Sequence, residues 1–274
     1  MAEQHTPRSL IFTLYGAYGR APDDAPLPVA ELIRLLGALG VDAPSVRSSV
    51  SRLKRRGLLV PERTAEGAAG YALSAEARQV LDDGDRRIYA RPSPRLSDGW
   101  LLAVFSVPEA ERHKRHLLRS RLGRLGFGTA APGVWIAPGR LHEETGHTLR
   151  RLQLDPYVDL FSGRHLGFEP TARAAARWWD LETIARQHQD FLDAHAPVLR
   201  AWEEREVVSP ENAYRDYLLA LGSWRRLVYT DPGLPVELLP PDWPGERSAE
   251  VFAHLHHRLR DLGAAFVMRP AAAE

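Results

Sequence analysis

The stretch DAPSVRSSVSRLKRRGLLVPER, residues 42–63, decides the fold of the N-terminal part of the chain. Asp42 can cap a helix here, because its carboxylate can accept hydrogen bonds from the free N–H groups of the first turn. Val46, Val50 and Leu53 recur four and then three residues apart, so they fall within about 60° of one another on a helix. We expect this face of the helix to enter a core.

The opposite side of the same helix carries small hydroxyl groups and long cations. Between Pro44 and Arg63 the chain has six basic residues and one acidic residue, whereas the net charge of the whole chain is only +1. Short serines let a helix approach base edges, arginine can donate two hydrogen bonds to guanine, and further cations neutralise phosphates. The predicted DNA-binding residues are Ser45, Arg47, Ser48, Ser51, Arg52, Lys54, Arg55, Arg56 and Arg63.

Two helices are predicted before this one. Thr6 and Pro7 are typical of a cap and a first helical residue, and this first helix closes near Gly19. The second helix runs from about Val29 and ends at Gly40.

A hairpin and one more helix follow. LLVPER and YALS predict two strands joined by a turn, and Ser74 can cap the next helix. Residues 1–95 therefore predict a winged helix-turn-helix DNA-binding domain that ends at the proline-rich RPSPRLSDG. The alternatives are a solvated basic face and a winged helix that makes only protein contacts.

The rest of the chain predicts two further domains, which makes the fold class multidomain α+β. Residues 96–170 read as β-α-β-β-α-β, a ferredoxin-like domain, provided that two short strands lie between Phe127 and Pro138. Residues 171–274 predict an all-helical domain, with Trp178, Leu181 and Ile184 at helical spacing. Its stretch SWRRLVYTDPGLPVELLPPDWPG is too rich in proline to form one helix.

Composition argues against several classes of protein. With no cysteine the chain has no disulfides, and it lacks both a secretion signal and a stretch of the roughly 20 apolar residues that a membrane span needs, so we expect a cytoplasmic protein. His142 and His147 are five residues apart, where a zinc protease helix needs four. No set of acid, base and nucleophile converges. We expect no enzyme, no catalytic residues, no metal and no bound cofactor.

Four stretches carry a resemblance to a known family. They are RSLIFTLYGAYG, SVRSSVSRLKRRGLL, VPEAERHKRHLLRSRLGRLGFGTAAPGVWIAP and YRDYLLALGSWRRLVYTDPGLPVELLPPDWPG. Together they resemble the PaaX family of bacterial repressors, which is named for control of phenylacetic acid catabolism. The resemblance implies a homodimer on a palindromic operator in double-stranded DNA, repression, and release by an acyl-CoA thioester such as phenylacetyl-CoA.

The central domain also resembles the small nuclease fold of Cas2 proteins, in which an acidic residue near the end of the first strand is expected to hold a metal. Here that end reads Phe105-Ser106-Val107-Pro108. Without a carboxylate a divalent cation loses its hard oxygen ligand, which weakens the nuclease interpretation. A Cas2-like metal-dependent nuclease or a CoA-dependent enzyme is kept as the alternative function.

The predicted effector site combines cations with aromatic side chains. A CoA thioester carries phosphates that arginine binds and an acyl group that needs apolar surroundings. The predicted ligand-binding residues are Trp224, Arg225, Arg226, Asp231 and Trp243. In the alternative, Asp231, Trp243 and the neighbouring prolines only brace the C-terminal domain.

Overall fold

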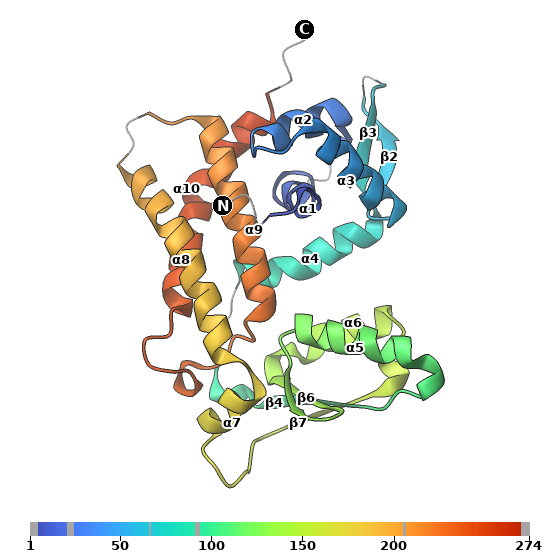
Figure 1. Cartoon of the computed structure of the whole chain (residues 1–274), viewed down its shortest axis with the longest axis vertical. Helices are drawn as coiled ribbons and strands as arrows, with labels where there is room; N and C mark the ends of the chain where they lie inside the picture. Colours follow the sequence, from blue (N-terminus) through green and yellow to red (C-terminus); the bar gives the residue numbers. More distant parts are fainter. Residues whose placement is uncertain (1–4, 21–24, 66, 91–93, 205–206, 270–274) are drawn as a thin grey trace. The chain divides into compact units, whose positions relative to one another are not determined.

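Two units, each assembled from segments that are distant in the sequence, make up the computed structural model (Figure 1). The first consists of Met1–Tyr89, Asp190–Arg225 and Glu246–Glu274, and the second of Ala90–Gln189 and Arg226–Gly245. The structure describes residues 5–20, 25–65, 67–90, 94–204 and 207–269. The predicted turn before the second helix and the linker RPSPRLSDG lie partly outside these residues. The division into domains 1–95, 96–170 and 171–274 stays a prediction.

Four helices of the first unit come from the N-terminal part of the chain. They are α1 (Pro7–Tyr18), α2 (Val29–Gly37), α3 (Ala43–Arg55) and α4 (Ala75–Tyr89). The predicted caps are present, because Thr6 Oγ1 accepts from the Ser9 amide at 3.2 Å and Ser74 Oγ from the Ala77 amide at 3.1 Å. The second helix ends at Gly37, and Gly40, with φ of +80°, lies in the turn that follows.

A small antiparallel sheet follows α3. Strands β2 (Leu59–Arg63) and β3 (Ala69–Leu73) form the predicted hairpin, with Leu59 opposite Leu73. A third strand, β1 (Leu27–Pro28), pairs with β3 and gives the order β1-β3-β2. The sequence analysis did not find β1, because two residues are too few to show the alternation that marks a strand.

Three long helices supply the remainder of the first unit. They are α8 (Leu181–Glu203), α9 (Pro210–Thr230) and α10 (Gly245–Val267). The first unit contains α8 from Asp190 onwards, α9 up to Arg225, and α10 from Glu246 onwards. Tyr214 and Leu218 of α9 belong to the same buried cluster as Leu14, Leu35 and Val50. The C-terminal helices therefore complete the core of the N-terminal elements.

The second unit contains a four-stranded antiparallel sheet. Its strands are β4 (Trp100–Phe105), β5 (Gly128–Ala131), β6 (Val134–Pro138) and β7 (Val158–Gly163), in the order β5-β6-β4-β7. Helix α5 (Arg112–Arg124) connects β4 to β5, and α6 (His142–Arg151) connects β6 to β7. This is the predicted β-α-β-β-α-β order of a ferredoxin-like domain.

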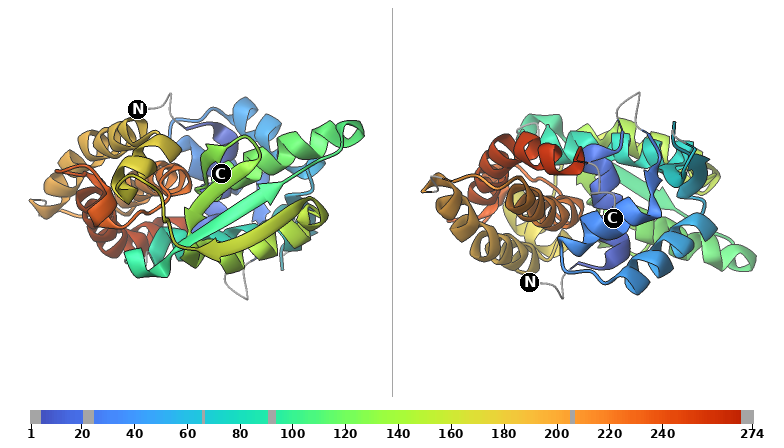
Figure 2. Two further views of the ribbon diagram at one scale, coloured as in Figure 1. Left: turned by 90° about the horizontal axis from the view of Figure 1, so that it is seen from below. Right: turned by 90° about the horizontal axis from the view of Figure 1, so that it is seen from above.

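Both faces of this sheet are covered by apolar side chains. Leu101 and Ala103 point into a core that includes Leu118 and Leu122 of α5, while Trp100 points to the other face and contacts Trp179. Alternating residues of one strand can serve two cores because successive side chains leave a strand on opposite sides. Figure 2 (left) shows the strands from the face opposite to α5 and α6.

The predicted helical pattern around Trp178 is divided between two helices. Helix α7 (Thr171–Trp178) ends before α8 begins at Leu181. The cause is local, since Asp180 Oδ1 accepts from the Thr183 amide at 2.9 Å and so caps a new helix. The stretch after Thr230 leaves the helix as predicted, with only a short turn of 3-10 helix at Val236–Leu238.

The core position Leu53 gives a test of the α3 packing. Leu53 is 1% exposed, so Leu53→Ala should lower the free energy of unfolding by about 2–5 kcal/mol through lost burial and a cavity. Arg52→Ala, at the adjacent exposed position, is the matched control and should change it by no more than about 0.5 kcal/mol. Denaturant unfolding followed by circular dichroism measures both, and equal effects would contradict the assigned faces.

Candidate nucleic-acid interface

One side of α3 is buried and the other is open to solvent, as the spacing of its apolar residues predicts. Val46, Val50 and Leu53 are 0%, 3% and 1% exposed and pack against α1 and α2. The opposite side presents the exposed predicted residues, which are Arg47, Ser48, Ser51, Arg52, Lys54, Arg55 and Arg56. The packing of α3 thus determines which of its side chains a duplex could reach.

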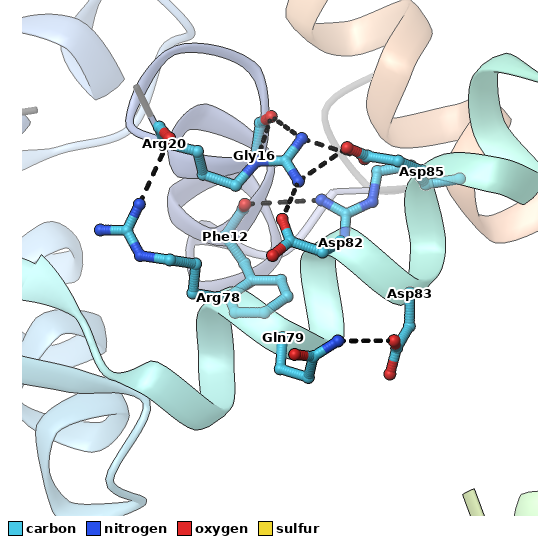
Figure 3. A network of polar contacts seen from close by, with 9 residues as sticks. Phe12, Gly16, Arg20, Arg78, Gln79, Asp82, Asp83 and Asp85 are labelled. Atoms are coloured by element: carbon cyan, nitrogen blue, oxygen red, sulfur yellow. Dashed lines mark hydrogen bonds and ion pairs between the residues drawn. The ribbon is translucent and has the colours of Figure 1, made fainter. Parts of the chain in front are cut away.

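The cationic side chains of this surface have no partner among the residues that the structure describes. Within that part of the chain, no side-chain hydrogen bond or ion pair involves Arg47, Arg52, Lys54, Arg55 or Arg56. Other arginines of the same unit are paired: Arg20 contacts Asp82 at 3.0 Å and Asp85 at 2.8 Å (Figure 3). A cluster of unpaired, exposed cations attracts a polyanion, because binding releases condensed counterions and costs no internal ion pair.

The charge is concentrated at the C-terminal half of α3. Arg52, Lys54 and Arg55 lie in its last turn, where the helix dipole also favours cations. At the other end the Asp42 carboxylate accepts from the Ser45 amide and from Ser45 Oγ, each at 2.8 Å. These hydrogen bonds, the backbone one first, hold the pKa of Asp42 below its ordinary value. The carboxylate therefore stays ionised at the start of the helix.

Two of the predicted DNA-binding residues have a structural contact of their own. Ser45 donates its hydroxyl to Asp42, so this hydroxyl is part of the helix cap. Arg63, at the end of β2, donates from Nη1 to the Gly67 carbonyl at 2.7 Å and so bridges the hairpin turn. The guanidinium of Arg63 is exposed, and contact of either residue with DNA stays a prediction.

The predicted ligand residues are divided between the two units. Trp224 belongs to the first unit, where it is 1% exposed and its indole N–H donates to the Ile88 carbonyl at 3.0 Å. Arg225, also in the first unit, donates from Nη1 to the Phe12 carbonyl at 3.4 Å, and its guanidinium lies 5.4 Å from the Phe12 ring centre. Both side chains are thus engaged within the fold.

The other three predicted ligand residues lie in the second unit. Arg226 is exposed, whereas Asp231 is buried, with Oδ2 at 3.0 Å from His188 Nε2 and Oδ1 accepting from the Gly233 amide at 2.8 Å. Trp243 meets the His188 ring edge to face at 5.8 Å. This geometry favours the bracing alternative for Asp231 and Trp243, and ligand contact stays a prediction.

The sequence analysis gave no role to His188 or Phe12, which complete these contacts. Neither of them belongs to a local motif, because their partners lie far away in the chain. His188 and Asp231, for example, are 43 residues apart. An aromatic or histidine residue on a buried helix face is the only signal available to a single sequence.

Three observations in the described part of the chain concern metal binding and membrane association. Strand β4 ends at Phe105, without a carboxylate, as predicted. Within the residues that the structure describes, no cluster of three or more His, Cys, Asp or Glu side chains could hold a metal ion. None of the described helices combines the length and apolarity needed to cross a membrane.

These features define a protein with a basic, outward-facing helix on one unit and a ferredoxin-like second unit. Three family models match along the chain: "PaaX-like protein" over residues 6–77, "PaaX protein central Cas2-like domain" over 93–175, and "PaaX-like protein C-terminal domain" over 179–269. The chain belongs to the PaaX family, and its central domain is Cas2-like.

One curated protein and one solved structure are also similar to the chain. The chain is 26% identical over 267 residues to "Transcriptional repressor PaaX" of Escherichia coli (strain K12), covering 94% of this chain and 82% of that protein. An uncharacterized protein from Mycobacterium tuberculosis shares the fold, with a TM-score of 0.60 and 22% sequence identity. The structural match covers 96% of this chain and 98% of that protein's chain.

The Asp42 cap predicts a pH-dependent stability. Because the pKa of Asp42 is lowered in the folded state, its stabilisation is present above the unfolded pKa and is lost as pH falls through the folded value. Asp42→Ala should therefore lower the Tm at neutral pH, and the difference from wild type should shrink in acid. Glu62→Ala, at an exposed carboxylate outside the helix cap, is the control for general charge effects. A pH-independent difference in Tm would contradict this role.

Proposed function

We propose that the N-terminal helices and the β1-β3-β2 sheet form a winged helix-turn-helix, with α3 as the reading helix and the β2–β3 hairpin as the wing. The observation that carries this proposal is the outer face of α3, where five unpaired cations lie beside the exposed serines Ser48 and Ser51. Small side chains allow close approach to a major groove, and arginine supplies paired donors for guanine.

The protein then acts in the cytoplasm as a DNA-binding transcriptional repressor and not as an enzyme. The Escherichia coli relative is a transcriptional repressor by name, which supports repression, and its alignment covers 94% of this chain. One α3 helix reads only a half-site, so a homodimer on a palindromic operator would present two such helices about 34 Å apart. The dimer is supported by the family resemblance.

The effector in this proposal is an acyl-CoA thioester, such as phenylacetyl-CoA, that releases the operator. Among the predicted ligand residues, Arg226 has an exposed side chain in the second unit, outside the DNA-reading elements. Release requires the ligand to prefer the form that does not bind DNA, and a hundredfold preference corresponds to about 2.7 kcal/mol of coupling.

The first prediction from this function concerns sequence discrimination. Arg47→Ala and Arg52→Ala should reduce the preference for operator over random duplex, since each arginine–guanine contact is worth about 1–3 kcal/mol. Competition binding against random duplex measures this preference. Unchanged preference in both variants would remove α3 as the reading helix.

Lys54→Ala and Arg56→Ala serve as the comparison within the same helix. As phosphate contacts they should weaken operator and random duplex alike, and each should reduce the slope of log K against log salt by about 0.9. Loss of discrimination in these variants with an unchanged salt slope would reverse the assigned roles.

The second prediction concerns release. Phenylacetyl-CoA should bind the full-length protein in calorimetry and dissociate it from its operator, whereas free phenylacetate should not, because it lacks the phosphates that arginine binds. A panel of other CoA thioesters and CoA alone identifies the acyl specificity. Equal release by free acids, or binding by no thioester in the panel, would count against a CoA effector.

A further inference from the structure

Helix α9 donates hydrogen bonds to the C-terminal turns of two N-terminal helices. The Tyr214 hydroxyl donates to the Leu35 carbonyl of α2 at 3.1 Å, and Trp224 Nε1 donates to the Ile88 carbonyl of α4 at 3.0 Å. Backbone carbonyls in the last turn of a helix receive no hydrogen bond from an N–H group of the same helix, so they need a donor from elsewhere. Here the donors come 179 and 136 residues later in the chain.

Both donors are inside the core. Tyr214 is 0% and Trp224 is 1% exposed, and the Trp224 ring centre lies 5.0 Å from that of Phe252 and 5.4 Å from that of Phe191. Water cannot replace a donor at such positions without a rearrangement of the packing, so a carbonyl that loses it remains unsatisfied. The two contacts therefore fix where α2 and α4 end relative to α9.

Arg225 makes a third contact with an N-terminal helix, in this case with a carbonyl in the middle of α1. Its guanidinium donates to the Phe12 carbonyl and lies over the Phe12 ring. Close by, a Cβ at Gly16 would lie 3.2 Å from Nη1 of Arg225 and 3.2 Å from a methyl carbon of Leu81 in α4. Helices α1, α4 and α9 thus come close together at Gly16, where a Cβ would require the ends of the Arg225 and Leu81 side chains to move by a few tenths of an ångström. Figure 3 shows Phe12 and Gly16 beside the aspartates of α4.

Helix α3 depends on these helices for its orientation. Its buried residues Val46, Val50 and Leu53 belong to the core cluster that also contains residues of α1, α2 and α9. Its cap bonds to Asp42 are local and hold its first turn only. A displacement of α1 or α2 would therefore change how the basic face of α3 is presented.

We propose that Tyr214, Trp224 and Arg225 of α9 are positioning residues for duplex binding. They act through α2, α4 and α1 respectively, and they hold α3 in the orientation that reads the operator without touching the duplex themselves. The proposal rests on the function proposed for α3. It also gives Trp224 and Arg225 a role that differs from direct contact with an effector.

A pair of matched tryptophan variants tests it. Trp224→Phe removes an indole donor from the Ile88 carbonyl, and the control Trp179→Phe removes an equivalent donor from the Gly126 carbonyl, at 2.9 Å, in the second unit. The probe is a duplex that full-length wild-type protein selects from a random-sequence pool. We expect Trp224→Phe to bind this duplex about tenfold more weakly, with unchanged affinity for random duplex, and Trp179→Phe to bind both normally.

A conservative tyrosine pair repeats the comparison with a smaller change. Tyr214→Phe removes only the hydroxyl that bonds Leu35, while Tyr157→Phe removes the hydroxyl that bonds Glu111 and Lys114 in the second unit. Only Tyr214→Phe should lower operator preference, and Arg225→Lys should retain more preference than Arg225→Met. Thermal melts separate these effects from global unfolding, since a purely structural role lowers Tm without changing the ratio of operator to random affinity.

Amide hydrogen exchange of the free proteins provides a readout that does not depend on DNA. In Trp224→Phe, exchange should become faster in α3 and α4 and stay unchanged in strands β4 to β7. Unchanged exchange in α3 and α4, or equal loss of operator affinity in Trp224→Phe and Trp179→Phe, would overturn the positioning role. If wild-type protein selects no sequence from the pool, the proposed function fails, while the exchange data still decide whether α9 holds the N-terminal helices.

Discussion

Hydrogen bonds from side-chain donors to the free carbonyls of helix ends link the distant segments of the first unit. Tyr214 and Trp224 of α9 bond the last turns of α2 and α4 in this way. Arg34 of α2 also donates, at 3.3 Å, to the Phe266 carbonyl of α10, which accepts from the Arg269 amide as well. Because an unpaired buried carbonyl is costly, each of these helices must end where the partner side chain can reach it. The N-terminal and C-terminal segments therefore specify each other's positions.

The charged side chains of this unit also differ in whether they have a partner within the fold. The charge of Arg20 is neutralised by Asp82 and Asp85 of α4, and its guanidinium also donates to the Gly16 carbonyl. The cations of α3 face solvent and have no acidic neighbour on their own helix. Between Pro44 and Arg63 the chain has six basic residues against one acidic residue, and most of these cations lie on the exposed side of α3. A surface of this kind is suited to bind a polyanion because no internal ion pair has to break first.

The second unit is built on close backbone approach. Gly128 lies where a Cβ would come within 3.0 Å of the Trp178 backbone, and the Trp179 indole donates to the Gly126 carbonyl. Glycine at such positions lets α7 and the start of α8 pack on one face of the sheet, while α5 and α6 cover the other. Buried on both faces over most of its length, strand β4 has the continuous apolar sequence WLLAVF.

The sequence by itself determined the local structure of this protein. The caps Thr6, Asp42 and Ser74, the buried face of α3 and the β-α-β-β-α-β order are all readable from it, because each depends on neighbouring residues or on helical and strand periodicity. Only the tertiary structure decided which segments share a core. Trp224 and Asp231 have similar aromatic and proline-rich surroundings in the sequence, yet one bonds Ile88 in the first unit and the other bonds His188 in the second. Such pairings depend on the three-dimensional path of the chain, and no local pattern in a single sequence encodes that path.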